Sequence, residues 1–255
     1  MIDQLKSESV EHQVSALERE LAARRSAEDM MIHDVRNPLS SMITIADMLS
    51  ARVTNEDDQL WLGRMKDLGY RALDILKATA GYGQMERGTY EPNTTDFDLL
   101  ACLAAALDQL SRLRDSRSLT IHYRFDGDPA AENSYLVRGD RFFLNQLFHN
   151  LITSVMEASP PQGELSIDVQ SGQPLRIVVH SHEGITLPLR SEFFDTSLGY
   201  ASGEKGAYEA HASQLVAAQH GGSVQYTTAE RGGSTLVISL PIAVECFADR
   251  LSASH

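Results

Sequence analysis

Apolar residues recur at alternating spacings of three and four over the first fifty residues of the chain. This heptad spacing predicts one long helix with a single apolar seam. Its members are Val10, Val14, Leu17, Leu21, Met31, Val35, Met42, Ile45 and Leu49. Arg24 and Glu28 interrupt the seam, and Pro38 falls on it and is expected to kink the helix. His33, two positions after Met31, therefore lies on the outer face of the helix.

A polar break at residues 53–58 predicts the start of a second helix, which ends near Met85. Its apolar stripe consists of Leu62, Met65, Leu68, Ala72 and Leu76. The two helices are expected to fold back on each other as an antiparallel hairpin. Because a lone hairpin leaves one side of its seam in water, the pattern predicts a homodimer in which two hairpins form a four-helix bundle.

The pattern changes after residues 87–93, which read as a linker to a second domain. Helices are expected over 99–113, 141–158 and 207–220, the last closed by Gly221 and Gly222. Strands are expected at 119–125, 135–137, 164–170, 175–180, 223–228 and 234–240. This order predicts an α+β chain in which the helical hairpin precedes an α/β sandwich with helices on one face of its sheet.

Composition narrows the possible partners and the compartment. The chain of 255 residues has 22 Lys and Arg against 35 Asp and Glu, a formal charge of −13. This balance disfavours nucleic acid and an anionic membrane surface as partners. The two cysteines give neither a disulfide framework nor zinc spacing, and no apolar run reaches membrane-spanning length. A cytoplasmic location is therefore expected.

The run His33-Asp34-Val35-Arg36-Asn37-Pro38-Leu39 carries the candidate chemistry. The neutral ring of His33 is a competent nucleophile for a phosphoryl group. Asp34 could hydrogen-bond to the other ring nitrogen or accept its proton. Asn37 lies one helical turn further on and could position a water molecule. The competing interpretation is an exposed histidine without function, which this seven-residue arrangement disfavours.

This run resembles the H-box of bacterial two-component sensor histidine kinases. The order of later segments resembles the same family: Phe97 to Leu100, Gly139 to Arg141, Leu144 to Leu151, His220 to Gly222 and Gly232 to Pro241. The likeness covers roughly residues 30–242. It implies a coiled-coil and dimerisation and histidine-phosphotransfer domain over 1–87, a kinase-like ATPase domain over 94–243 and a tail over 244–255.

Three boxes that hold ATP in this family depart from its pattern. Asn150 matches the first asparagine of the N-box, but Ser154 stands where the second is expected. The stretch 180–184 retains only Gly184 of Asp-x-Gly-x-Gly, so that His180 takes the place of the adenine-reading aspartate. The glycine-rich box is reduced to Gly206, followed by Tyr208 and Glu209, and the lid between Gly184 and Gly206 is short. The resemblance thus implies a degenerate ATP site, with Asn150 as its one matching ligand.

The leading hypothesis is a histidine phosphotransferase that exchanges a phosphoryl group between His33 and the aspartates of response-regulator receiver domains. It needs no cofactor on this chain, because magnesium belongs to the receiver. One alternative is an active, divergent histidine kinase that uses Mg-ATP to phosphorylate His33. A second is a non-catalytic pseudokinase that binds its partner, so whether the chain is an enzyme stays open. A metal site built from His180, His182 and either His211 or His220 is disfavoured, because their spacing is not that of a ligand set.

Overall fold

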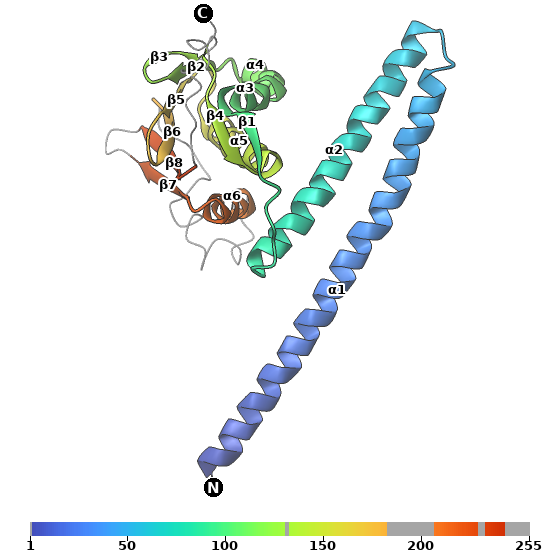
Figure 1. The fold of residues 1–255 in the computed structure, drawn as a ribbon, viewed down its shortest axis with the longest axis vertical. Helices are drawn as coiled ribbons and strands as arrows, with labels where there is room; N and C mark the ends of the chain where they lie inside the picture. Colours follow the sequence, from blue (N-terminus) through green and yellow to red (C-terminus); the bar gives the residue numbers. More distant parts are fainter. Residues whose placement is uncertain (1, 131–132, 183–206, 229–232, 243–255) are drawn as a thin grey trace, which may run out of the picture. The chain divides into compact units, whose positions relative to one another are not determined.

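The computed structural model describes residues 2–130, 133–182, 207–228 and 233–242, with the side chains of 2–11 and 18 left aside. The described chain divides into two compact units, one ending at Gly83 and the other beginning at Gln84. Figure 1 shows the first as a pair of long helices and the second as a sheet with helices. The expected tail over 244–255 lies outside the described residues. None of the described helices is both apolar enough and long enough to span a bilayer.

The first unit is a hairpin of α1, Ile2–Ser50, and α2, Glu56–Glu86. Helix α1 continues through Pro38, as the heptad spacing predicts. Asn55 caps α2, because its side-chain oxygen accepts hydrogen bonds from the backbone N–H groups of Asp57 and Asp58 at 2.9 and 3.2 Å. Three acidic residues in the first turn of α2 add favourable charge at the positive end of the helix dipole.

The two helices of the hairpin pack most closely around Ile43. This residue and Ala46 are 6% and 2% exposed, although both lie on a helix that is otherwise largely exposed. A Cβ atom added to Gly69 would lie 2.6 Å from Cγ1 of Ile43, so α2 approaches α1 here because Gly69 has no side chain. An ion pair between Lys66 and Asp47, at 3.0 Å, joins the helices one turn away.

We expect Gly69→Ala to destabilise the hairpin by about 1–3 kcal/mol, because the methyl group overlaps the buried Ile43 side chain. Gly63→Ala is the matched control on the same helix. No atom lies within 4 Å of a Cβ at that position, so alanine should stabilise α2 by up to about 1 kcal/mol. Urea unfolding followed by the fluorescence of Trp61, the chain's one tryptophan, measures both. Equal shifts in the same direction would contradict this packing.

The second unit contains two sheets. A two-stranded antiparallel sheet pairs β1, Thr95–Asp98, with β4, Leu136–Gly139. The six-stranded sheet has the order β3-β2-β5-β6-β8-β7, in which only β2 and β5 pair in parallel. Its strands are β2 Thr120–Phe125, β3 Asp128–Pro129, β5 Glu164–Gln170, β6 Leu175–Ser181, β7 Ser223–Thr228 and β8 Ser234–Leu240.

Four helices accompany this sheet: α3 Leu99–Gln109, α4 Ser111–Arg117, α5 Arg141–Ala158 and α6 Ala207–Gln219. Figure 1 shows them gathered on one face of the sheet. Alternate residues of the central strands are buried on that side, so the core lies between the sheet and α3, α5 and α6. The predicted architecture, a helical hairpin followed by an α/β sandwich, is confirmed.

The structure corrects three local predictions. The helix expected over 99–113 is two helices, because the chain departs from helical geometry at Leu110, whose N–H bonds to the carbonyl of Leu107. Strands β1 and β3 were not expected, since one is four residues with a polar pattern and the other is two residues. The strands predicted at 164–170, 223–228 and 234–240 and the helix predicted at 141–158 have the expected bounds.

Candidate functional site

His33 stands on α1 with its side chain 68% exposed. The carboxylate of Asp34, itself 70% exposed, places Oδ1 3.6 Å from Nδ1 of the ring. This distance exceeds that of a hydrogen bond but brings a negative charge to the Nδ1 side. The contact therefore favours a proton on Nδ1 and leaves the lone pair on Nε2, which is the atom available to attack an electrophile.

Asn37 follows His33 by four residues on the same helix, so its side chain lies one turn away and on the same side. The backbone carbonyl of Asn37 accepts a hydrogen bond from the Ser41 hydroxyl at 3.0 Å. Because Pro38 has no N–H, the carbonyl of Asp34 lacks its usual helical donor. The structure thus brings His33, Asp34 and Asn37 together on one exposed stretch of α1, as their spacing predicts.

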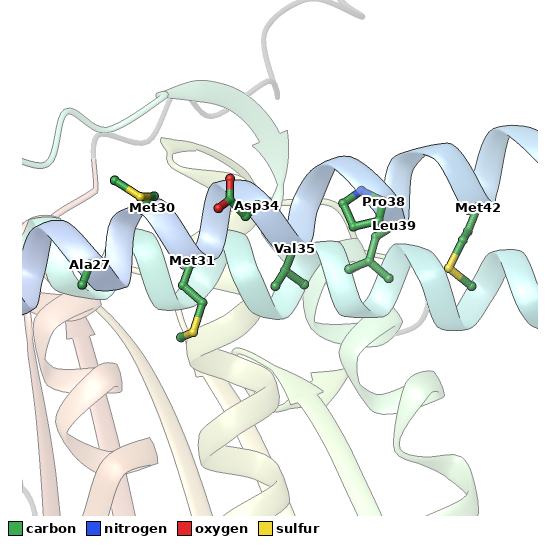
Figure 2. A pocket seen from close by; sticks show the side chains of 8 residues that line it. All are labelled: Ala27, Met30, Met31, Asp34, Val35, Pro38, Leu39 and Met42. Atoms are coloured by element: carbon green, nitrogen blue, oxygen red, sulfur yellow. The ribbon is translucent and has the colours of Figure 1, made fainter.

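An apolar groove lies beside this stretch, with a cavity volume of about 490 Å³. Figure 2 shows the side chains that line it, all of them from α1. They are Ala27, Met30, Met31, Asp34, Val35, Pro38, Leu39 and Met42. Asp34 is the one charged member, while Met30 and Met31 are more than 60% exposed. The candidate acceptor is therefore bordered by exposed apolar surface from the heptad seam.

In the second unit, α5 carries Asn150 and Ser154 one turn apart. The Ser154 hydroxyl donates a hydrogen bond to the backbone carbonyl of Asn150 at 2.9 Å. The hydroxyl hydrogen of Ser154 is therefore used in a hydrogen bond within its own helix, and only the oxygen lone pairs are available to bind a cation. Asn150 is partly buried, and it is the residue that matches the first asparagine of the N-box.

Side chains at the end of strand β6 point to both faces of the sheet. Ser181 is 1% exposed, and its hydroxyl oxygen lies 3.4 Å from that of Ser159 at the end of α5. Since side chains alternate along a strand, His180 points to the opposite face, where Nδ1 lies 2.9 Å from the Thr235 hydroxyl. The position directed toward α5 is therefore Ser181, whereas His180 lies on the opposite face of the sheet.

Other predicted positions are only partly described. Residues 183–206, which include Gly184, Gly203 and Gly206, lie outside the described residues. Tyr208 is 42% exposed in the first turn of α6, and Glu209 beside it is partly buried. The rings of His180 and His182 meet edge to face at 4.7 Å, but within the described ranges no three His, Cys, Asp or Glu residues form a group able to hold a metal.

Residues 139–244 match the family of histidine kinase-, DNA gyrase B- and HSP90-like ATPases. The chain is 25% identical over 251 residues to the sensor-like histidine kinase SenX3 of Mycobacterium tuberculosis, covering 93% of this chain and 58% of that protein. It is also 25% identical over 172 residues to the autoinducer 2 sensor kinase/phosphatase LuxQ of Vibrio cholerae, covering 66% of this chain. The chain is thus similar to sensor histidine kinases over most of its length. It spans 19% of LuxQ and 58% of SenX3.

A solved structure has the same fold over most of the chain. Full-length ShkA in complex with AMPPNP superposes with a TM-score of 0.59 at 13% identity, over 87% of this chain and 46% of ShkA. At this identity the likeness concerns the fold alone. It agrees with the hairpin and sandwich of Figure 1.

In the second unit, Asn150 supplies one amide, and Ser154, one turn further along α5, supplies a neutral hydroxyl. Mg²⁺ favours carboxylate and carbonyl oxygens, and a serine whose hydrogen is already donated to the backbone is a weaker ligand. The buried hydroxyls of Ser159 and Ser181 also face each other.

Proposed function

We propose that this chain is the phosphotransfer part of a two-component signalling protein of the histidine kinase type, and that His33 carries the phosphoryl group. The observation that carries the proposal is an imidazole 68% exposed to solvent with a carboxylate 3.6 Å from one ring nitrogen. The ATPase-family match over 139–244 and the similarity to sensor kinases support it. Cytoplasmic action on a receiver domain is part of the same proposal.

The proposed step is a substitution at phosphorus. Nε2 of His33 attacks, the N–P bond forms as the bond from phosphorus to the donor oxygen breaks, and that oxygen leaves as an anion. The ring gains positive charge while Nδ1 keeps its proton. The carboxylate of Asp34 near Nδ1 offsets this charge. In the reverse direction, a receiver aspartate oxygen attacks phosphorus and the neutral imidazole leaves.

Two donors fit this step, and each has an observation in its favour. The match of residues 139–244 to an ATPase family, together with the similarity to proteins named as kinases, supports ATP as the donor, so that the chain would phosphorylate itself. The hydroxyl of Ser154, at the position where the resemblance implies a second asparagine, supports the aspartyl phosphate of a receiver domain instead. The similarity to kinases favours ATP as the donor. The side chain at position 154 makes the receiver's aspartyl phosphate the second candidate.

A paired labelling experiment decides between these donors. One sample of the full chain receives Mg²⁺ and ATP labelled on the γ-phosphate, and the other receives a labelled, phosphorylated receiver domain. Label on His33 from ATP identifies a kinase, whereas label only from the receiver identifies a phosphotransferase. Absence of label from both donors would contradict the proposal and leave a binding protein. Asn150→Ala is the matched variant: it should lower labelling from ATP and leave labelling from the receiver unchanged.

We also propose that the exposed seam of the hairpin binds a second copy of the chain. Ile45, Met42 and Leu49 are each about half exposed in the single chain, which is unusual for a regular apolar stripe. We expect Ile45→Asp to weaken the dimer at least about a hundredfold, because a buried unpaired charge costs several kcal/mol. Thr44→Asp adds the same charge on another face of α1 and should leave the dimer intact. Sedimentation equilibrium measures both; a monomeric parent protein would refute the dimer.

A further inference from the structure

The six-stranded sheet of the second unit has β3 and β7 as its outer strands, and these two differ in length. An outer strand presents a row of backbone N–H and C=O groups that can pair with a strand of another chain. Strand β3 is only Asp128 and Pro129, so it is too short for such pairing, and the proline has no N–H to donate. Strand β7 has six residues and depends on another form of protection.

The sequence of β7 does not by itself prevent pairing with another chain. The strand reads Ser-Val-Gln-Tyr-Thr-Thr over residues 223–228, without charge, proline or glycine. Valine, tyrosine and threonine are residues that favour strands. Copies of a chain with a formal charge of −13 repel each other, but β7 places no charge at the edge to oppose close approach of a second β7. Its protection must therefore come from elsewhere in the fold.

The side chain of Gln214, on α6, is bound to the outer edge of β7. Its Nε2 donates to the backbone carbonyl of Val224 at 2.8 Å, and its Oε1 accepts from the backbone N–H of the same residue at 3.2 Å. In an antiparallel strand, the N–H and C=O of one residue point to the same side. Those of Val224 therefore point away from β8, although Val224 lies opposite Ile238 of that strand.

The two bonds of Gln214 have the pattern of a neighbouring strand. Two residues of paired antiparallel strands exchange an N–H···O bond in each direction, and Gln214 makes the same exchange with Val224. A glutamine side chain can do so because it ends in an amide, which carries a donor and an acceptor as a peptide group does. Gln214 is partly buried and Val224 is 2% exposed, so water competes weakly for these bonds.

We propose that Gln214 closes the edge of β7 to strand addition by a second copy of the chain. By alternation, the backbone groups of Tyr226 and Thr228 point to the same edge as those of Val224. An incoming strand must displace the Gln214 amide before it pairs along the whole of β7. Such pairing would join two copies through their second units, whereas the proposed dimer uses the hairpin. The closure does not depend on whether His33 carries a phosphoryl group.

Gln214→Met removes both hydrogen bonds and keeps the approximate length of the side chain. In dilute solution, hydrogen exchange of the full chain should become about tenfold faster at the Val224 amide, which loses its acceptor. In concentrated solution, sedimentation velocity should give a weight-average mass at least about twice that of the parent protein, because uncovered edges pair. Gln225→Met is the matched control: this exposed glutamine lies on β7 itself, and its replacement should change neither result.

A second substitution tests whether β7 is the surface that pairs. Thr227 is an exposed residue of β7, and a lysine on an edge strand opposes pairing because two copies then bring like charges together. Adding Thr227→Lys to Gln214→Met should return the mass to that of the parent protein, while the Val224 amide keeps its fast exchange. Far-ultraviolet circular dichroism should be the same for the parent protein and every variant, which separates edge pairing from unfolding.

Each outcome decides for or against the closure. Unchanged exchange at Val224 in Gln214→Met would overturn it, because Gln214 would then not protect that amide. Faster exchange without any increase in mass would overturn it as well, since the uncovered edge would not bind a second copy. A larger mass that persists after Thr227→Lys is added would place the contact on another surface and contradict the proposal. Faster exchange, a larger mass and its reversal by the lysine would together support it.

Discussion

His33→Gln should abolish phosphorylation of the chain, whichever donor the parent protein uses. Glutamine is similar in length and polarity, but its amide nitrogen has no lone pair available to attack phosphorus. We expect the loss to be complete within detection, because the reaction has no other route to an N–P bond on α1 near this exposed face. The measurement is the acid-labile, alkali-stable label that remains after incubation with labelled donor and denaturing electrophoresis.

The control for this variant is His12→Gln. His12 is an exposed histidine on the same helix, without an acid-amide pattern after it, so its replacement should leave the label unchanged. Asp34→Asn is a graded variant: it keeps the shape of the side chain and removes the charge near Nδ1, so labelling should slow about tenfold or more while the label stays on His33. If His33→Gln retained the label, a residue other than His33 would be the phosphorylated one.

Local patterns of apolar residues and glycines along the chain were sufficient to predict most of the helices and strands. The three-and-four spacing predicts α1 through Pro38, and the Gly221 and Gly222 pair predicts where α6 stops. The break at Leu110 could not be predicted in this way. Leu110 is 6% exposed and apolar, so its side chain continues the helical pattern while its backbone leaves it. Packing of the chain, and not propensity, ends α3 there.

The sequence indicated the phosphoryl-acceptor stretch more fully than the nucleotide-type site. His33, Asp34 and Asn37 lie on one helix, so their separation follows from helix geometry alone. Ser154, Ser159 and Ser181 come from a helix and a strand that are distant in sequence. Alternation along β6, with Ile177 and Val179 buried, was the available signal that Ser181 and not His180 faces the core. Glycine spacing alone was an insufficient guide.

Asp140→Ala should destabilise the second unit by about 3–5 kcal/mol, as much as the truncation of a core side chain. The carboxylate is 3% exposed and caps α5 through the N–H of Phe143 at 3.2 Å, while it also accepts from Tyr90 and Asn93. Loss of a helix cap costs about 1 kcal/mol. The partly buried Tyr90 hydroxyl and the backbone N–H of Asn93 also lose a charged acceptor. Each of these bonds that water does not replace adds about 1.5–3 kcal/mol.

Urea unfolding measures this loss, provided that the two units are followed separately. Six of the eight tyrosines follow residue 84, so near-ultraviolet circular dichroism in the tyrosine band reports mainly the second unit. The fluorescence of Trp61 reports the hairpin and should be little changed. Asp96→Ala is the control, because its ion pair with Arg138 is 3.9 Å long and two-thirds exposed and should cost no more than about 0.5 kcal/mol. Asp140→Asn keeps one acceptor and should fall between the two. If Asp140→Ala were as mild as the control, the carboxylate of Asp140 would not hold residues 90–93 in place. The contact of Tyr90 with α5 would then depend on ring packing against Phe143 alone.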